Sequence, residues 1–308
     1  MSVITWLAPL LVSVGAGGYW LWLYLRYGQE PGPDPCPAPV STPPYDWAPV
    51  HVGYLYTRGE LLPRDMIATI ADLAWRAVIS LDAEPVSVLT AGGILGADQE
   101  YGYFVSHGSA RREPLTNSER YLVEQVLTLG PERDARVSLT DLMIQVARHG
   151  AAGYGRFDEW RRLCAAEPQP IPIYDELSLR MSRRAIILGV LLMPACYPLA
   201  VLFRSPYSIG LVALGAAMVS GSKAIRRRTQ EAVNAFGRWR AYRAHLAGLP
   251  DLPNLPIQSI ILKGRPLIYA IAFGIARAAI EPFRLLCSDW ETVSSSANAY
   301  PSALTNRD

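Results

Sequence analysis

Residues 2–25 read SVITWLAPLLVSVGAGGYWLWLYL and contain no charged side chain. An α-helix rises about 1.5 Å per residue, so about 20 such residues cross the hydrocarbon core of a bilayer. Aromatic residues gather at the end of the stretch, and the first positive charge, Arg26, lies there too. A cleaved signal peptide would carry basic residues before its apolar run. The stretch therefore predicts a transmembrane anchor over residues 1–25 rather than a cleaved signal.

Two more apolar runs lie close together, at about residues 185–203 and 206–222. Basic residues precede the first run and follow the second, and only Arg204 lies between them. The pattern predicts a transmembrane hairpin over residues 183–222. Because Lys and Arg collect on the cytoplasmic side of a membrane, we expect the N-terminus outside and the C-terminus in the cytoplasm. The expected location is a bacterial inner (cytoplasmic) membrane, crossed more than once.

The last apolar run carries small residues at four-residue spacing, namely Ala213, Ala217 and Gly221. Such a face lets helix backbones approach closely. These residues are predicted to pack the helices of the hairpin together, in preference to lining a transport path. The protein as a whole is a candidate homo-oligomer. No Asp, Glu, His, Lys or Arg lies deep within any of the three runs, whereas ion and proton pathways generally need one. We therefore do not expect a pump or a channel.

Charge divides the remainder of the chain. Residues 27–179 hold 21 Asp and Glu against 12 Arg, a net charge of −9. Residues 180–249 hold 11 Lys and Arg against Glu231 alone, a net charge of +10. The sequence thus predicts an acidic soluble part and a basic part beside the membrane.

Residues 26–48 are dense in proline and predict an extended spacer, with recognition by an SH3-type domain as the alternative. Residues 49–108 predict a winged-helix-like α+β module, because two helical patterns precede two strand patterns. The helices are expected at Val50–Tyr56 and from Pro63 onward, and the strands start near Val78 and at Tyr101. The loop between the strands, residues 83–100, is long for a wing.

Residues 109–182 predict a helical subdomain that ends at the membrane. Thr116-x-x-Glu119 and Ser138-x-x-Asp141 both have the pattern of a capping box, which opens a helix. A third helix is expected at Phe157–Ala166, where a run of prolines follows.

Residues 223–287 predict basic amphipathic and apolar cytoplasmic helices. The first, at 223–247, places an apolar stripe beside clustered arginines, so it would lie on the anionic leaflet or pack on the soluble domain. Residues 266–276 are too short for a span and predict a buried or interfacial helix. Residues 288–308 predict a disordered tail. The cations predicted to face the membrane surface and anionic lipids are Arg183, Arg184, Lys223, Arg226, Arg227, Arg228, Arg238, Arg240 and Arg243.

We find no pattern of catalytic, cofactor-binding or metal-ligating residues in the sequence. The four histidines stand alone, without a second ligand at metal spacing, and the four cysteines are far apart. The glycine-rich stretches match neither a phosphate-binding loop nor a dinucleotide fingerprint. We therefore expect a protein that is not an enzyme and that needs no cofactor.

Three stretches resemble one known family: VGYLYTRGELLPRDMIATIADLAWRAVISLD at residues 52–82, RRRT at 226–229 and YAIAFGI at 269–275. The family is the predicted membrane proteins catalogued as domain of unknown function 2207, and the resemblance covers roughly residues 20–285. It implies a winged-helix-like cytoplasmic part and a hairpin, and it implies no activity. Such proteins typically carry an extracytoplasmic β-rich domain before the first span, which we expect to be missing here because the sequence starts at the membrane.

Two functions remain as hypotheses. The first is a non-enzymatic membrane scaffold that presents a cytoplasmic domain to an unidentified protein partner. The second is a membrane-tethered regulator that binds nucleic acid through the winged helix or the arginine-rich helix. Duplex DNA attracts proteins mainly through Lys and Arg on its phosphates. The acidic balance of residues 27–179 therefore favours the scaffold over nucleic-acid binding.

Overall fold

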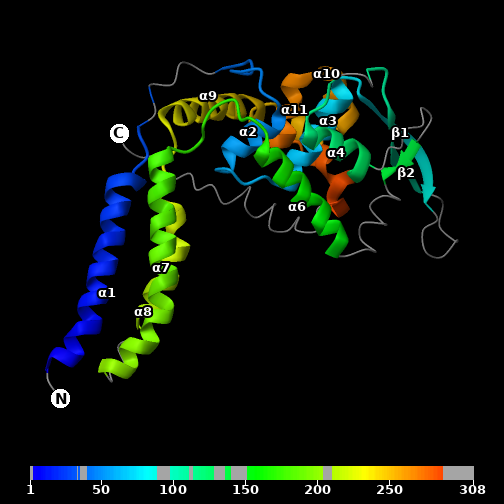
Figure 1. Ribbon diagram of the computed structural model, residues 1–308. Coiled ribbons are helices and arrows are strands. Elements are labelled where there is room, and N and C mark those ends of the chain that lie inside the picture. Colours follow the sequence, from blue (N-terminus) through cyan, green and yellow to red (C-terminus); the bar gives the residue numbers. More distant parts are fainter. Residues whose placement is uncertain are drawn as a thin grey trace. The chain divides into compact units, whose positions relative to one another are not determined.

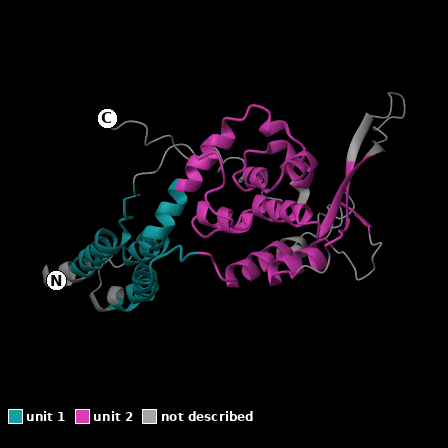
Figure 2. Cartoon of the chain, turned by 90° about the horizontal axis from the view of Figure 1, so that it is seen from above, with its two compact units in different colours: residues 1–36, 171–237 teal, residues 37–170, 238–308 magenta. Residues whose placement is uncertain are grey.

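The computed structural model describes residues 3–32, 34, 40–88, 98–110, 114–127, 136–139, 151–203 and 210–286. The chain folds as two compact units (Figure 2). Unit 1 consists of Met1–Cys36 and Ile171–Gly237, and unit 2 consists of Pro37–Pro170 and Arg238–Asp308. Each unit therefore combines an early and a late part of the chain.

Unit 1 contains three apolar helices: α1 (Val3–Leu23), α7 (Glu176–Phe203) and α8 (Gly210–Gly221), drawn close together in Figure 1. Short turns of helix follow α1 and α8, namely the π-helical η1 (Tyr24–Gly28) and the 3-10 helix η4 (Ser222–Ile225). The described residues of the predicted apolar runs are thus helical.

Helices α7 and α8 approach most closely at two glycines. A Cβ atom added to Gly215 would lie 2.5 Å from the Gly189 carbonyl oxygen, and one added to Gly189 would lie 2.8 Å from the Gly215 carbonyl oxygen. The predicted packing residues Ala213 and Ala217 are instead exposed, so that prediction is wrong for the hairpin. Gly221 does pack, but against the ring of Trp20 in α1. Four-residue spacing identified a small-residue face without showing which face of the helix turns inward.

Length and hydropathy by themselves do not confirm the three predicted spans. Within the described part of the chain, no single helix is both long enough and apolar enough to cross a bilayer. Helices Arg265–Ala272 and Arg277–Phe283 meet the requirement together, although an 81° bend separates them. Ile268, Tyr269 and Ile271 of the first helix are almost fully buried in the protein. Of the two predicted environments for residues 266–276, the structure therefore shows the buried one.

Unit 2 is mainly helical, with one small sheet (Figure 1). Its elements are α2 (Pro49–Tyr56), α3 (Pro63–Trp75), β1 (Ile79–Val88), β2 (Asp98–His107), α4 (Asn117–Tyr121), η2 (Leu122–Val126), β3 (Arg136–Ser138), α6 (Ala151–Ala166), η5 (Leu252–Asn254), α10 (Ile257–Lys263), α11 (Arg265–Ala272), α12 (Arg277–Ile280) and η6 (Glu281–Leu286). Helix α9 (Gln230–Ala247) belongs to unit 1 up to Gly237 and to unit 2 from Arg238.

The order of helix, helix and two antiparallel strands predicted for residues 49–108 is confirmed. In the sheet, Leu81 of β1 lies opposite Val105 of β2. The strands are longer than predicted, and β3 pairs with β2 as a third, unpredicted strand. The sequence did not predict β3, because the strand is only three residues long and has no alternating apolar pattern.

Of the two predicted capping boxes, the structure confirms one and describes only part of the other. The capping box at Thr116 is confirmed: the Glu119 amide donates to Thr116 Oγ1 at 3.3 Å, and the Thr116 amide donates to Glu119 Oε2 at 3.0 Å. Ser138 of the second predicted box ends β3, and its partner Asp141 lies outside the described residues. Residues 288–308, the predicted tail, lie outside them as well.

The helix predicted at 223–247 begins only at Gln230. Thr229 opens it, because its Oγ1 accepts the amide of Ala232 at 3.1 Å. Just before it, Arg228 forms an isolated antiparallel bridge with Tyr174. The apolar stripe of α9 is buried in the protein at Trp239 and Tyr242, among others. Those side chains are consequently not available to a bilayer, which leaves protein packing as the environment of this stripe.

The end of the proline-rich segment packs on unit 2 and is not a free spacer there. Tyr45 and Trp47 stack with ring centroids 4.7 Å apart, and the Trp47 ring lies 6.2 Å from that of Trp239. The Tyr269 hydroxyl donates to the Trp47 carbonyl at 2.7 Å. Proline density predicted an extended backbone, but two large aromatic rings in the segment gave it a surface to bury.

Candidate functional site

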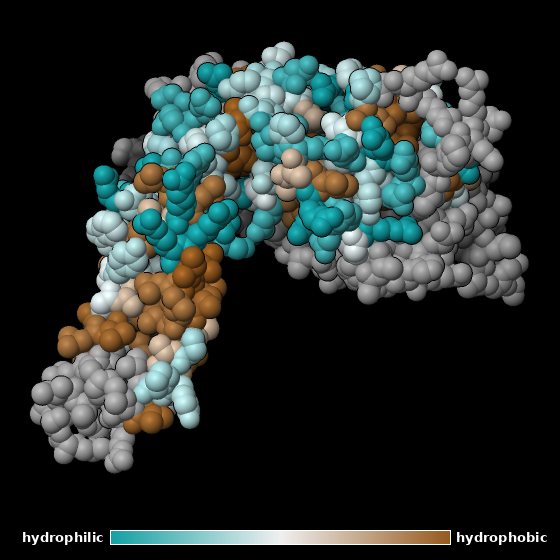
Figure 3. Space-filling view, viewed as in Figure 1, coloured by the Kyte–Doolittle hydropathy of each residue, from teal (hydrophilic) through white to brown (hydrophobic). Residues whose placement is uncertain are grey.

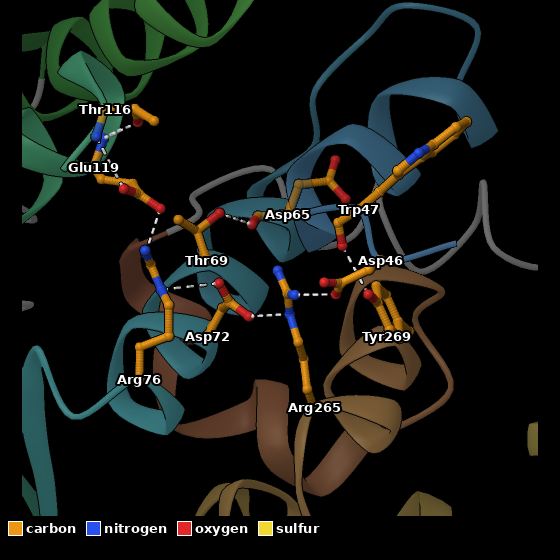
Figure 4. Close-up of polar contacts among 10 residues, drawn as sticks. All are labelled: Asp46, Trp47, Asp65, Thr69, Asp72, Arg76, Thr116, Glu119, Arg265 and Tyr269. Atoms are coloured by element: carbon orange, nitrogen blue, oxygen red, sulfur yellow. Dashed lines mark hydrogen bonds and ion pairs between the residues drawn. The ribbon is translucent and has the colours of Figure 1, made fainter. Parts of the chain in front are cut away.

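A network of charged side chains joins four segments of unit 2 (Figure 4). Arg265, the first residue of α11, bonds to Asp72 of α3 (Nε to Oδ1, 2.9 Å) and pairs with Asp46. Asp72 is also paired with Arg76, one helical turn further on, at 3.4 Å. Arg76 in turn bonds to Glu119, the acidic residue of the capping box.

The charges of this network satisfy one another. Asp72 is 2% exposed, and a buried carboxylate is tolerated only when cations and donors surround it. Each arginine in the network meets two carboxylates, so the charges are satisfied inside the fold. The arrangement holds α3, α4, α11 and the segment before α2 in register.

A second buried carboxyl group lies at the start of α3. The side chain of Asp65 is fully buried, and its Oδ2 accepts the amide of Leu62 at 2.7 Å. Its Oδ1 has no hydrogen-bond partner among the described residues, and Gly53 of α2 lies directly against it. Burial raises the pKa of this carboxyl to about 7, against the opposing effects of Arg64 and the Leu62 amide. Asp65 therefore titrates near neutral pH without facing solvent.

Two further titratable groups of unit 2 are also built into its core. His51 Nδ1 lies 3.0 Å from Gln169 Oε1, and burial lowers the pKa of this histidine. Burial raises the pKa of the Cys164 thiol to about 12, so it stays protonated and is a poor nucleophile. No group of His, Cys, Asp or Glu within the described ranges has the arrangement of a metal site.

A groove of about 500 Å³ lies on unit 2. Its walls are the turn after α2 and one face of α6, with the residues Tyr54, Gly59, Glu60, Leu61, Asp158, Arg161, Arg162 and Ala165. Arg161 pairs with Asp158 at 3.6 Å, and Arg162 pairs with Glu159 at 2.7 Å. Exposed pairs of this kind are weak and exchange partners at little cost. The groove can therefore accept a segment that carries both charges.

The nine cations predicted to face the membrane surface fall into two groups in the structure, those held by other side chains and those that are more accessible. Arg228 is 7% exposed, donates to both carboxylate oxygens of Glu30 at 3.0 Å, and lies over the Phe236 ring. Arg227 pairs with Asp175 at 3.5 Å. In unit 2, Arg238 donates to the Tyr45 hydroxyl at 3.0 Å and Arg243 lies over the Tyr56 ring.

The other predicted cations are more accessible. Arg183, Arg184, Lys223 and Arg240 are exposed, and Arg226 is half-buried with its Nε 3.4 Å from the Ser182 hydroxyl. Sequence analysis missed the burial of Arg64 and Asp65 and the Arg265 network. The only sequence evidence for either was the four polar residues, from Arg64 to Asp72, inside an otherwise apolar helix.

The exposed apolar side chains gather on unit 1. Of the 19 large hydrophobic side chains that are exposed among the described residues, 16 belong to this unit. Helices α1, α7 and α8 carry most of them, and Figure 3 shows this part of unit 1 as a brown, hydrophobic surface. They are Leu10, Leu11, Val12, Val14, Tyr19, Leu21, Trp22, Tyr24, Leu25, Leu177, Ile187, Val190, Leu191, Tyr197, Val201 and Val212. Apolar surface on this scale is characteristic of a membrane or protein interface.

A family model described as predicted membrane protein (DUF2207), C-terminal domain, matches residues 39–283. The chain belongs to this family. The resemblance inferred from residues 52–82, 226–229 and 269–275 is thereby confirmed, since all three stretches lie inside the match. No curated protein and no solved structure matches the chain. The membership makes a membrane location plausible, and the family's description assigns no activity.

Proposed function

We propose that this DUF2207 protein is a non-enzymatic membrane scaffold. Helices α1, α7 and α8 cross the bilayer, with the N-terminus outside, and unit 2 is a cytoplasmic domain that binds another protein. The observation that carries the proposal is the exposed apolar surface of unit 1, in a family of predicted membrane proteins. Lipid would cover side chains that water solvates poorly.

The contents of unit 2 favour a binding role over catalysis. Asp72, Arg76, Arg265 and Glu119 satisfy one another, and the Cys164 thiol is held protonated. The mixed-charge groove between the turn after α2 and α6 is the surface we assign to the partner. Its chemistry suits a polar peptide segment that presents acidic and basic side chains in turn.

The cations of α3 are not presented to nucleic acid. A winged helix that reads DNA needs basic side chains free to reach phosphates. Arg64 is 5% exposed, and Arg76 is bonded to Glu119 and Asp72. This arrangement supports protein binding over the nucleic-acid alternative.

Cysteine labelling in intact cells tests the topology. In a background without the four native cysteines, a cysteine at Ser205 in the hairpin connection should react with an impermeant maleimide added outside. A cysteine at Arg120 in unit 2 should react only after the membrane is permeabilised. Labelling of Arg120→Cys from outside, or loss of the protein from the membrane fraction, would refute the proposed arrangement.

Site-specific photocrosslinking tests the groove. A benzoyl-phenylalanine at Tyr54, which lines the groove, should give a protein adduct in cells, whereas one at the exposed Trp75 should not. Charge reversal by Arg161→Glu with Arg162→Glu should abolish the adduct. The matched reversal Arg156→Glu with Arg240→Glu, at exposed positions outside the groove, should leave it. No adduct at Tyr54, or the same adduct from both positions, would contradict the assignment.

A further inference from the structure

Three segments of unit 1 meet at one level. Leu23, Ala185 and Ile225 form a buried cluster, and Trp20, Tyr27 and Met181 pack against it. The ends of α1, α7 and η4 are therefore held side by side. The Ser182 hydroxyl donates to the Ser222 carbonyl at 2.9 Å, which fixes α7 against the start of η4. The η1 segment also lies close to η4, because a Cβ atom added to Gly28 would lie 2.9 Å from the Ala224 carbonyl oxygen.

Cations from all three segments surround this cluster. Arg26 belongs to η1, and Arg183 and Arg184 follow Ser182 on α7. Lys223 lies in η4, and Arg226 directly follows it. All are exposed except Arg226, which is half-buried. We call these five residues the basic collar.

Three acidic residues of the same unit pair with arginines outside the collar. Glu30 bonds to Arg228, Asp175 to Arg227, and Glu176 to Arg180. Among the described residues, Arg26, Arg183, Arg184 and Arg226 have no carboxylate partner. The described residues thus leave the charge of these four arginines without a carboxylate partner, so an external anion would provide one.

The collar borders the apolar surface of unit 1. Leu25 directly precedes Arg26, and Ile187 lies one turn after Arg183 on α7; both side chains are more than half exposed. The exposed rings of Trp22 and Tyr24 lie at the same end of α1, where aromatic residues mark the lipid–water interface. A ligand that fits this border carries a negative head group and hydrocarbon chains.

We propose that the basic collar binds the phosphate of anionic lipid head groups. The proposal rests on the membrane-spanning role given to unit 1 above, and it deepens it by naming the lipid class and the residues. It also redraws the nine-residue set predicted from sequence. The collar keeps Arg183, Arg184, Lys223 and Arg226 and adds Arg26. It omits four cations that pair or stack within the protein, namely Arg227, Arg228, Arg238 and Arg243. It also omits Arg240, which belongs to unit 2.

Lipid binding to the full-length protein tests the collar. The protein is purified in a mild detergent and titrated with phosphatidylglycerol, with phosphatidylcholine or with inorganic phosphate, and bound lipid is counted by native mass spectrometry. A basic residue near an anionic surface contributes a factor of about five. The quadruple variant Arg26→Gln, Arg183→Gln, Arg184→Gln, Lys223→Gln should bind phosphatidylglycerol on the order of a hundredfold more weakly or worse.

Two variants control for charge and for folding. Arg120→Gln, Arg156→Gln, Lys263→Gln and Arg277→Gln together remove the same charge from exposed positions of unit 2, and they should leave binding within about twofold. Replacing Arg26, Arg183, Arg184 and Arg226 by Lys keeps the charge and should preserve binding. Both expectations support the collar only if the wild type prefers phosphatidylglycerol over phosphatidylcholine.

Several outcomes would overturn the proposal. Equal binding of the two lipids by the wild type would do so, as would equal weakening by the collar and control variants. Competition by millimolar inorganic phosphate would show a site for free phosphate rather than for lipid. The failure of the wild type to insert into membranes at all would refute the proposed function itself. Correct insertion with no lipid preference would refute the collar alone.

Discussion

Replacing Asp72 by Asn removes a carboxylate that two arginines share, while leaving the volume of the side chain almost unchanged. Asp72 is 2% exposed, and its partners Arg265 and Arg76 keep side-chain exposures of 18% and 19%. Removing one member of a buried ion pair typically costs about 3–5 kcal/mol. Each arginine retains a second carboxylate, so we take the low end, about 3 kcal/mol.

The assay is hydrogen exchange of the full-length protein in detergent, read by mass spectrometry on peptides from α3 and α11. Because every 1.4 kcal/mol is a factor of ten, amides that exchange by opening the network should exchange about a hundredfold faster in Asp72→Asn. Peptides from α8, in unit 1, should exchange at the wild-type rate.

Asp46→Asn is the matched control. It removes a carboxylate from the same arginine, but the Asp46 side chain is 88% exposed, and exposed pairs contribute at most about 1 kcal/mol. Exchange in α11 should therefore rise about fivefold or less. If the two variants differ by less than about threefold, burial does not set the strength of this network and the reasoning is refuted.

Three further predictions follow from single positions. In Gly53→Ala the new methyl group would overlap the Asp65 carboxylate, so the free energy of unfolding should fall by about 1–3 kcal/mol. Gly237→Ala, with open space around the new methyl group, should be neutral or slightly stabilising. The melting temperatures of the two variants test this difference. Burial raises the pKa of Asp65 to about 7 from 3.8, so the folded state keeps a proton that the unfolded state releases. Protection of α3 amides, corrected for intrinsic exchange, should therefore fall as pH rises from about 4 to about 7 and stay level above that; a fall of the same size in Asp65→Asn would contradict this assignment. Gly215→Val should separate α7 from α8 and lower the melting temperature, whereas Ala213→Val, at an exposed position, should leave the temperature unchanged when both are measured in the same detergent.

Local patterns were sufficient to predict most helices. Helix α3 was predictable because Pro63 fits the first turn and apolar residues recur at helical spacing. The Thr116 capping box was predictable because its partners lie three residues apart. In both cases the residues that indicate the helix lie within a few positions of one another in the sequence.

Contacts between distant segments could not be predicted in this way. Arg265 meets Asp72 and Asp46 across about two hundred residues, and nothing in the sequence links their positions. The choice of Gly215 over Ala213 as the inward face depends on the orientation of α8, which Gly189 on another helix decides. A single sequence shows where the small residues are, but not which residues of another helix they pack against.

The same reasoning explains why counting charges gave an incomplete picture of the basic region. A net charge of +10 over residues 180–249 suggested one continuous surface, yet Arg228 is held by Glu30 and Phe236. What matters for a lipid or protein partner is charge left exposed after the fold has formed its own pairs. In unit 1 that charge lies where three helix ends meet, beside Leu25 and Ile187, and its position there makes a phospholipid a better fit than a soluble anion.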